Sequence, residues 1–118
     1  MAAGTVRVAR VYDAPGPRDG ARVLVDRLWP RGLRKDAAHV DVWLKEVAPS
    51  KELRTWYGHD PDRRDEFAER YRVELSDDDH AEALARLRAL VQKGPVTLLT
   101  ATRDTSLSQA AVLADYLR

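Results

Sequence analysis

The chain has 118 residues, 44% of them hydrophobic, and its 20 Lys and Arg nearly balance its 19 Asp and Glu for a net charge of +1. This length predicts one domain over residues 1–118. The near-zero charge argues against long-range attraction to nucleic acid or to an anionic membrane. The lack of cysteine excludes disulfides and thiol nucleophiles. Without a signal-peptide pattern or a membrane-length apolar stretch, we expect a cytoplasmic protein that is not bound to a membrane.

Short strands are predicted in the first half of the chain. Valines alternate in residues 5–12, and the prolines and glycine at residues 15–17 end this strand. A second buried strand is expected over residues 22–26. Residues 39–47 combine strand-like alternation with a helical face, and we favour a helix or an irregular segment there.

Helices are predicted in the second half. Ser50 is a suitable N-cap for a short helix that Gly58 ends. Asp60 and Pro61 supply an N-cap and a first-turn proline for a second helix. A third helix is expected after Ser76 and the acidic run at residues 77–79, since acids favour a helix N-terminus.

The end of the chain completes the pattern. The third helix is expected to bury Ala81, Leu84, Leu87 and Val91, and Gly94 with Pro95 to end it. Residues 96–99 predict a buried strand, and the last helix is expected to bury Leu107, Ala110, Ala114 and Leu117. Strands alternating with helices predict an α/β fold, a small layered domain with a mainly parallel sheet flanked by helices.

The most unusual segment is the run Arg27–Gly32, which directly follows the second predicted strand. Ligands of open parallel sheets bind beyond the carboxyl ends of the strands. We therefore expect Arg27 and Arg31 to meet Arg103, which follows the last strand, with Trp29 as a wall beside them. Guanidinium groups favour phosphate or carboxylate, so the expected partner is a small anionic ligand.

Each of these residues also fits a structural role. Arg27 and Arg31 could pair with neighbouring acids and hold the loop. Trp29 also fits a core anchor. Arg103 and Asp104 also fit a strand-to-helix turn in which Asp104 lies near the cap.

His59 and Asp60 are the candidate acid–base pair, because a histidine beside an acid can move protons near neutral pH. Capping by Asp60 is the alternative. The acids at 77–79 satisfy a helix dipole without a ligand, so no metal site is predicted and the cofactor is unknown. Ser106 and Gln109 have capping-box spacing. No nucleophile and no common nucleotide, zinc-protease or serine-hydrolase motif is present.

Several blocks resemble the YeaO-like branch of the family called domain of unknown function 488: Val11-Tyr12-Asp13, Asp19-Gly20, Arg22–Gly32, Ala48-Pro49-Ser50 with Glu52-Leu53-Arg54, Gly58–Pro61 and Pro95–Leu99. The resemblance implies a small cytoplasmic bacterial α/β protein without an assigned activity. It supports the following as motif positions: Asp13, Arg27, Trp29, Pro30, Arg31, Gly32, His59 and Asp60, with Arg103-Asp104 as the basic–acidic pair after the last strand.

One segment departs from the family pattern. Relatives have His or Gln followed by Asn shortly after the basic–acidic pair, whereas this chain has Leu107-Ser108-Gln109. If that polar pair takes part in binding or catalysis, the resemblance implies an altered or lost activity.

Two functions fit these residues. One is a pocket for a small phosphate- or carboxylate-bearing ligand, either enzymatic or purely binding. The other is a homodimeric interaction module that uses Arg27–Gly32 as its interface, because Trp and Arg are favoured at interface hot spots. Extended nucleic-acid contact does not suit the near-neutral charge, and binding of a single strand end stays open.

Overall fold

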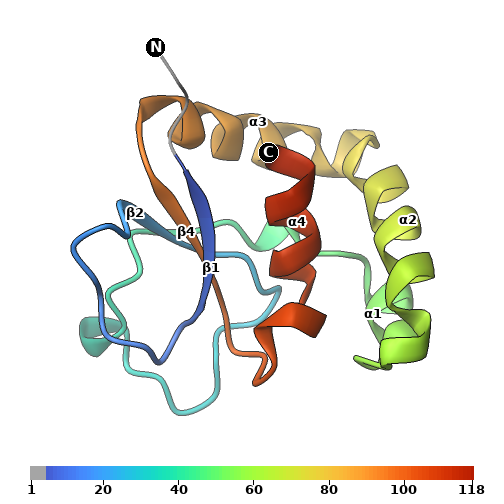
Figure 1. Cartoon of the computed structure of the whole chain (residues 1–118), viewed down its shortest axis with the longest axis horizontal. Coiled ribbons are helices and arrows are strands. Elements are labelled where there is room, and N and C mark those ends of the chain that lie inside the picture. Colours follow the sequence, from blue (N-terminus) through green and yellow to red (C-terminus); the bar gives the residue numbers. More distant parts are fainter. Residues whose placement is uncertain (1–4) are drawn as a thin grey trace.

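A computed structural model describes residues 5–118 as a four-stranded sheet with helices beside it (Figure 1). The strands are β1 (Val6–Arg10), β2 (Ala21–Leu24), β3 (Val42–Trp43) and β4 (Val96–Thr100). Their order is β1-β4-β2-β3, and every neighbouring pair is parallel. All carboxyl ends therefore lie at one edge. The predicted α/β fold with a parallel sheet is confirmed.

Four α-helices lie within residues 5–118, in the predicted order along the chain. They are α1 (Lys51–Tyr57), α2 (Arg64–Leu75), α3 (Asp78–Lys93) and α4 (Gln109–Leu117). The Ser50 hydroxyl accepts from the backbone N–H of Leu53, and Gly58 ends α1 in the left-handed region with φ of 54°. Asp60 caps a short 3₁₀ turn that leads into α2.

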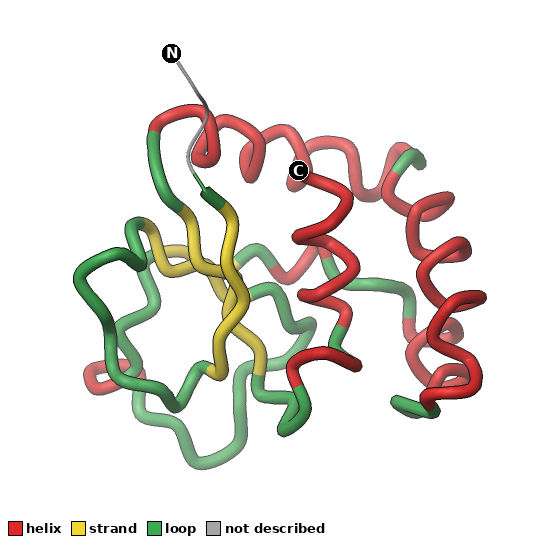
Figure 2. Tube along the Cα trace, viewed as in Figure 1, coloured by secondary structure: helices red, strands yellow, loops and turns green. Residues whose placement is uncertain are grey.

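The two faces of the sheet are covered differently. Val23, Val25 and Leu98 belong to the main core, which the helices share, whereas Leu24 and Leu99 pack with Val11 in a smaller cluster under the loops. Neighbouring residues of β2 and of β4 belong to different clusters because successive side chains along a strand point to opposite faces of the sheet. Helices lie to one side of the strands and long loops to the other (Figure 2).

Four expectations need correction. Leu107 lies in the 3₁₀ turn before α4 and not on the buried face of that helix. Residues 39–47 are not mainly helical, because Val42–Trp43 pair with β2 and only a 3₁₀ turn (Lys45–Val47) follows. The capping box at residues 106 and 109 does not form, since Ser108 caps α4 and accepts from Ala111. Ala81 is exposed on α3, and Ala83, two residues further along, is buried instead.

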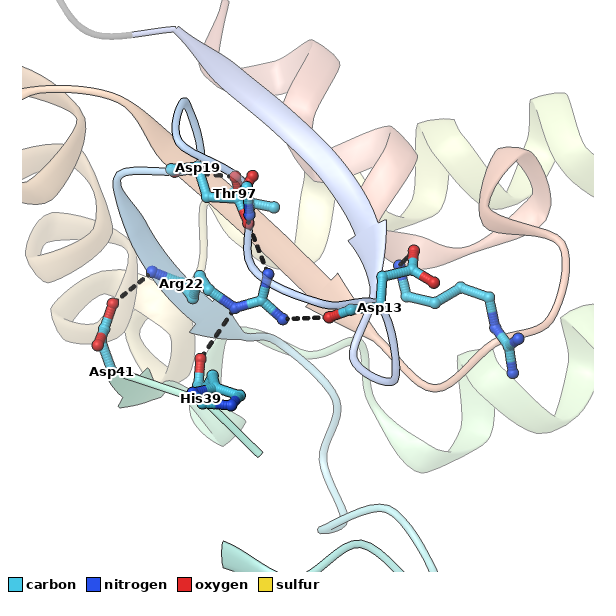
Figure 3. A network of polar contacts seen from close by, with 8 residues as sticks. Asp13, Asp19, Arg22, His39, Asp41 and Thr97 are labelled. Atoms are coloured by element: carbon cyan, nitrogen blue, oxygen red, sulfur yellow. Dashed lines mark hydrogen bonds and ion pairs between the residues drawn. The ribbon is translucent and has the colours of Figure 1, made fainter. Parts of the chain in front are cut away.

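A buried arginine ties the loops to the sheet. Arg22 is 4% exposed. Its guanidinium donates from Nε to the His39 carbonyl (2.9 Å), from Nη1 to the Asp19 carboxylate (2.6 Å) and from Nη2 to the Asp13 carbonyl (3.0 Å) (Figure 3). Its backbone N–H donates to Asp41 at 2.9 Å. Arg22 thus joins the loops before and after β2, the second of which includes the arginine-rich run.

Candidate functional site

A cavity of about 460 Å³ lies at the carboxyl edge of the sheet, beyond β2 and β4. Its wall comes from four parts of the chain: the run that follows β2, helix α1 with the turn after it, helix α2, and the segment from β4 into α4. Residues far apart in the sequence meet here because parallel strands end at one edge. We call this the carboxyl-edge cavity.

Asp26 supplies a carboxylate to the wall, and that carboxylate is already engaged. Oδ1 accepts from the Thr100 hydroxyl (2.8 Å) and from Nε2 of Gln109 (2.6 Å). Oδ2 accepts from the backbone N–H of Ala101 at 2.8 Å. Three neutral donors stabilise the Asp26 carboxylate, which thereby joins β2, β4 and α4 and forms no ion pair with the arginines of the cavity among the described residues.

Two arginines line the carboxyl-edge cavity. Arg31 is exposed and forms no ion pair with residues 5–118. Arg54, on α1, is half-buried, and its Nε is buried without a hydrogen-bond partner among the described residues. A buried donor without a partner costs about 1–3 kcal/mol, so an acceptor that reaches this guanidinium is favoured.

Aromatic rings form the inner wall. Tyr57 and Phe67 are both buried and stack with ring centroids 4.0 Å apart. Tyr57 donates its hydroxyl to the Leu107 carbonyl at 2.7 Å, and burial raises the pKa of this phenol. Trp29 is half-buried, donates Nε1 to the Leu33 carbonyl (2.7 Å) and packs edge-on against Trp43. Trp29 is therefore both an anchor and a wall residue.

The structure separates the candidate acid–base pair. His59 is exposed, lines the cavity and contacts the edge of Tyr57 with centroids 5.6 Å apart. Asp60 accepts from the backbone N–H of Asp62 at 2.9 Å and lies 3.8 Å from Arg63. Asp60 thus has the capping position, and no hydrogen bond joins its carboxylate to His59 among the described residues.

Arg27 does not share this cavity with Arg31. It lines a second cavity of about 270 Å³ together with the acids Glu46, Glu74 and Asp79. Within residues 5–118 it forms no ion pair closer than 4 Å. The expected meeting of three arginines is therefore not present, because the two arginines of the run lie in different cavities.

Three other predicted site residues lie outside the wall. Arg103 is exposed beyond β4. Asp104 accepts from the backbone N–H of Ser106 at 3.0 Å, as a turn cap does. Asp13 accepts from the backbone N–H of Arg10 at 3.2 Å in the turn after β1. Any contact of these three with a ligand stays a prediction.

Sequence reasoning missed Arg54 and Gln109 as wall residues. Arg54 belongs to a motif block, but it has no local signal because it enters the site through the tertiary packing of α1. The spacing of Ser106 and Gln109 suggested a cap and concealed the Gln109 contact with Asp26, which spans the sequence from β2 to α4. A long-range hydrogen bond of this kind leaves no periodic pattern in the sequence.

Within residues 5–118, no group of three or more His, Cys, Asp or Glu side chains is arranged to hold a metal ion. Over the same residues, none of the helices combines the length and the apolar character that a bilayer crossing needs.

Comparison with known protein families identifies the family of this chain. The family described as "Inactive DUF488-N3 subclade" matches residues 5–118. The chain belongs to this subclade. The resemblance to the YeaO-like branch of domain of unknown function 488 is thereby confirmed.

Bacterial relatives of this DUF488-N3 protein cover nearly its whole length. The uncharacterized proteins Rv3073c of Mycobacterium tuberculosis (strain ATCC 25618 / H37Rv) and Mb3100c of Mycobacterium bovis are each 59% identical over 112 residues, covering 95% of this chain and 92% of theirs. The uncharacterized protein YeaO of Escherichia coli (strain K12) is 42% identical over 113 residues, covering 96% of each. No solved structure gives a significant match.

The segment that departs from the family pattern lies beside the site of this DUF488-N3 protein. The backbone carbonyl of Leu107 holds the Tyr57 hydroxyl, Ser108 caps α4, and Gln109 lines the carboxyl-edge cavity. A change in this segment therefore alters the wall itself.

Proposed function

We propose that this protein is a non-catalytic binding domain for a small phosphate- or carboxylate-bearing ligand held in the carboxyl-edge cavity. The observation that carries the proposal is that Arg54 lines the same cavity as Arg31 while its buried Nε has no hydrogen-bond partner within residues 5–118. A guanidinium binds an oxyanion with parallel N–H donors. Because three donors already occupy Asp26, its carboxylate competes little for these arginines.

Binding without catalysis suits the groups in the wall. Catalysis by a hydroxyl or thiol nucleophile needs a base within hydrogen-bond reach of that group. The Tyr57 hydroxyl donates a hydrogen bond to the Leu107 carbonyl, and Thr102 Oγ1 accepts one from Thr100 Oγ1 at 3.1 Å. His59 lacks a carboxylate partner among the described residues. The subclade's description as inactive agrees with this interpretation.

A thermal-shift assay with inorganic phosphate, citrate and adenosine monophosphate tests the proposal. The variants are Arg54→Gln and Arg31→Gln, with Arg72→Gln on the exposed face of α2 as the matched control. A ligand at a hundred times its Kd stabilises by about 2.7 kcal/mol, which raises Tm by on the order of 10 °C. We expect that rise for at least one anion in the wild type and the control, and its loss in Arg54→Gln. Equal rises in all four proteins would contradict the proposal.

One observation favours the second candidate, a homodimer formed through Arg27–Gly32. Leu28, in the middle of this run, is 72% exposed and so offers apolar surface that a partner chain could cover. Mass in solution for the wild type and Leu28→Asp distinguishes the two functions. A dimer that Leu28→Asp dissociates without unfolding would favour the interface, whereas monomers in both leave the pocket as the function.

A further inference from the structure

Resting on the proposed anion binding, we infer that the ligand also carries a planar ring with an N–H donor, and that Gln109 recognises this donor. A nucleoside monophosphate has this combination of groups. The inference adds a ligand class and a specificity-determining residue to the site.

The size and the wall of the cavity argue for more than a simple anion. A volume of about 460 Å³ lies in the range of roughly 300–1,000 Å³ that holds drug-sized organic ligands. Besides its polar groups, the wall contains Trp29, Tyr57 and Phe67. Inorganic phosphate has no surface that benefits from aromatic walls, whereas a planar ring stacks on them or packs against their edges.

These aromatic side chains are held in place. The Trp29 indole is fixed by its bond to the Leu33 carbonyl and by Trp43, while Tyr57 is fixed by Phe67 and by the Leu107 carbonyl. A preformed wall binds a rigid ring without first losing side-chain freedom.

Gln109 supplies the polar selectivity. It is 8% exposed, and its amide lies against the Asp26 carboxylate, with the contacting atoms 2.6 Å apart. An ionised carboxylate only accepts hydrogen bonds, so the amide nitrogen must face Asp26 and Oε1 is left as an acceptor. Oε1 receives no hydrogen bond within residues 5–118. Because Gln109 lines the cavity, this acceptor suits a donor on the ligand.

The groups of the wall match the parts of a nucleotide. Arg54 and Arg31 suit the phosphate, the aromatic wall suits the base, and Gln109 suits an N–H on the edge of that base. Asp26 acts through Gln109 by fixing its amide, and is therefore a positioning residue.

Calorimetric titration of the full chain with ribose 5-phosphate and with the four nucleoside 5′-monophosphates tests the inference. Both kinds of probe carry the phosphate, and only the nucleotides carry the base. We expect the best nucleotide to bind the wild type at least about tenfold more tightly than ribose 5-phosphate, since a site built to hydrogen-bond a donor discriminates strongly against a ligand without it. Equal affinities would overturn the inference and leave anion binding intact.

The matched variants are Gln109→Met and, on the exposed face of α3, Gln92→Met. We expect Gln109→Met to weaken nucleotide binding about tenfold, with unchanged affinity for ribose 5-phosphate as evidence of a folded site. Gln92→Met should bind both as the wild type does. An unchanged nucleotide affinity in Gln109→Met would overturn its role, and absence of binding by all probes would overturn the proposed function as well.

Discussion

Gly20 shows how one missing side chain permits a close approach of two segments. Its φ is 63°, and an added Cβ would lie 2.0 Å from the backbone carbonyl oxygen of Pro95. The backbone N–H of the next residue, Ala21, donates to that carbonyl at 3.0 Å, so the contact begins the pairing of β2 with β4. Only glycine fits both the conformation and the space.

We therefore expect Gly20→Ala to lower the free energy of unfolding by about 2 kcal/mol or more, from the left-handed backbone and the clash together. Gly32→Ala is the matched control, because Gly32 has φ of 77° and no atom within 4 Å of an added Cβ. It should cost about 1 kcal/mol, from the backbone alone. Urea unfolding measures both, and an equal loss would show that the contact with Pro95 is unimportant.

Arg22 is the second residue with a large expected effect. Removing its guanidinium takes the donor from two backbone carbonyls and leaves the Asp19 carboxylate with the backbone N–H of Gly16 alone. Arg22→Met should cost about 3 kcal/mol, because the side chains of this pair are 5% and 17% exposed. In contrast, Arg34→Met should cost less than about 1 kcal/mol, since the Arg34–Asp36 pair is 80% and 70% exposed. Similar costs for both variants would contradict this account of the loops.

At the scale of elements, the start of α3 is built around one acid. The Asp77 carboxylate accepts from the His80 backbone N–H (3.0 Å) and lies 2.7 Å from Nδ1 of the buried His80 ring. The other ring nitrogen of His80 lies 2.9 Å from the Ala48 carbonyl. The His80 side chain thus joins α3 to the segment that leads into α1, the helix that carries Arg54.

The hydrogen bond from the His80 side chain holds the pKa of Asp77 below its usual value of 3.8. As pH falls, the unfolded chain therefore takes up a proton before the folded chain does. The stabilisation is complete above about pH 4 to 5 and is lost as pH falls through the lower, folded-state pKa.

Asp77→Asn keeps an N-cap but removes this titration. We expect the urea midpoint of the wild type to fall more steeply below about pH 4 than that of Asp77→Asn. Asp78→Asn, one residue further along and exposed, is the control and should follow the wild type. Parallel pH profiles for wild type and Asp77→Asn would contradict the role assigned to Asp77.

Across the whole molecule, sequence patterns predicted the elements better than the site. Caps at Ser50 and Asp60 have strong local signals, and both residues cap, although Asp60 caps the 3₁₀ turn that leads into α2. The two-residue strand Val42–Trp43 was missed because residues 39–47 combine strand-like alternation with a helical face, and the pairing with β2 decides between the two. Short strands of this kind depend on their neighbours.

The prediction of the site was limited in the same way, because local patterns indicate its position and long-range packing decides which side chains line it. The rule for parallel sheets located the edge where the cavity lies, and Trp29, Arg31 and His59 do line it. The rule did not indicate which way each side chain extends, so Arg27 and Arg31, four residues apart, lie in separate cavities. Arg54 lies on α1, and it lines the cavity only because of the tertiary packing of that helix.

The central claim is that Arg54 binds the anionic group of a ligand, and the resonance of its Nε–H group tests this most directly. In ¹⁵N-labelled protein this signal is identified by its loss in Arg54→Gln. Arg10 is an internal control, because its Nε is also buried without a partner among the described residues and it is not a wall residue of the cavity.

On titration with adenosine monophosphate, we expect the Arg54 Nε–H signal to shift until it saturates, while the Arg10 signal stays in place. Movement of both signals together, or of neither at concentrations that saturate any other probe of binding, would contradict the claim.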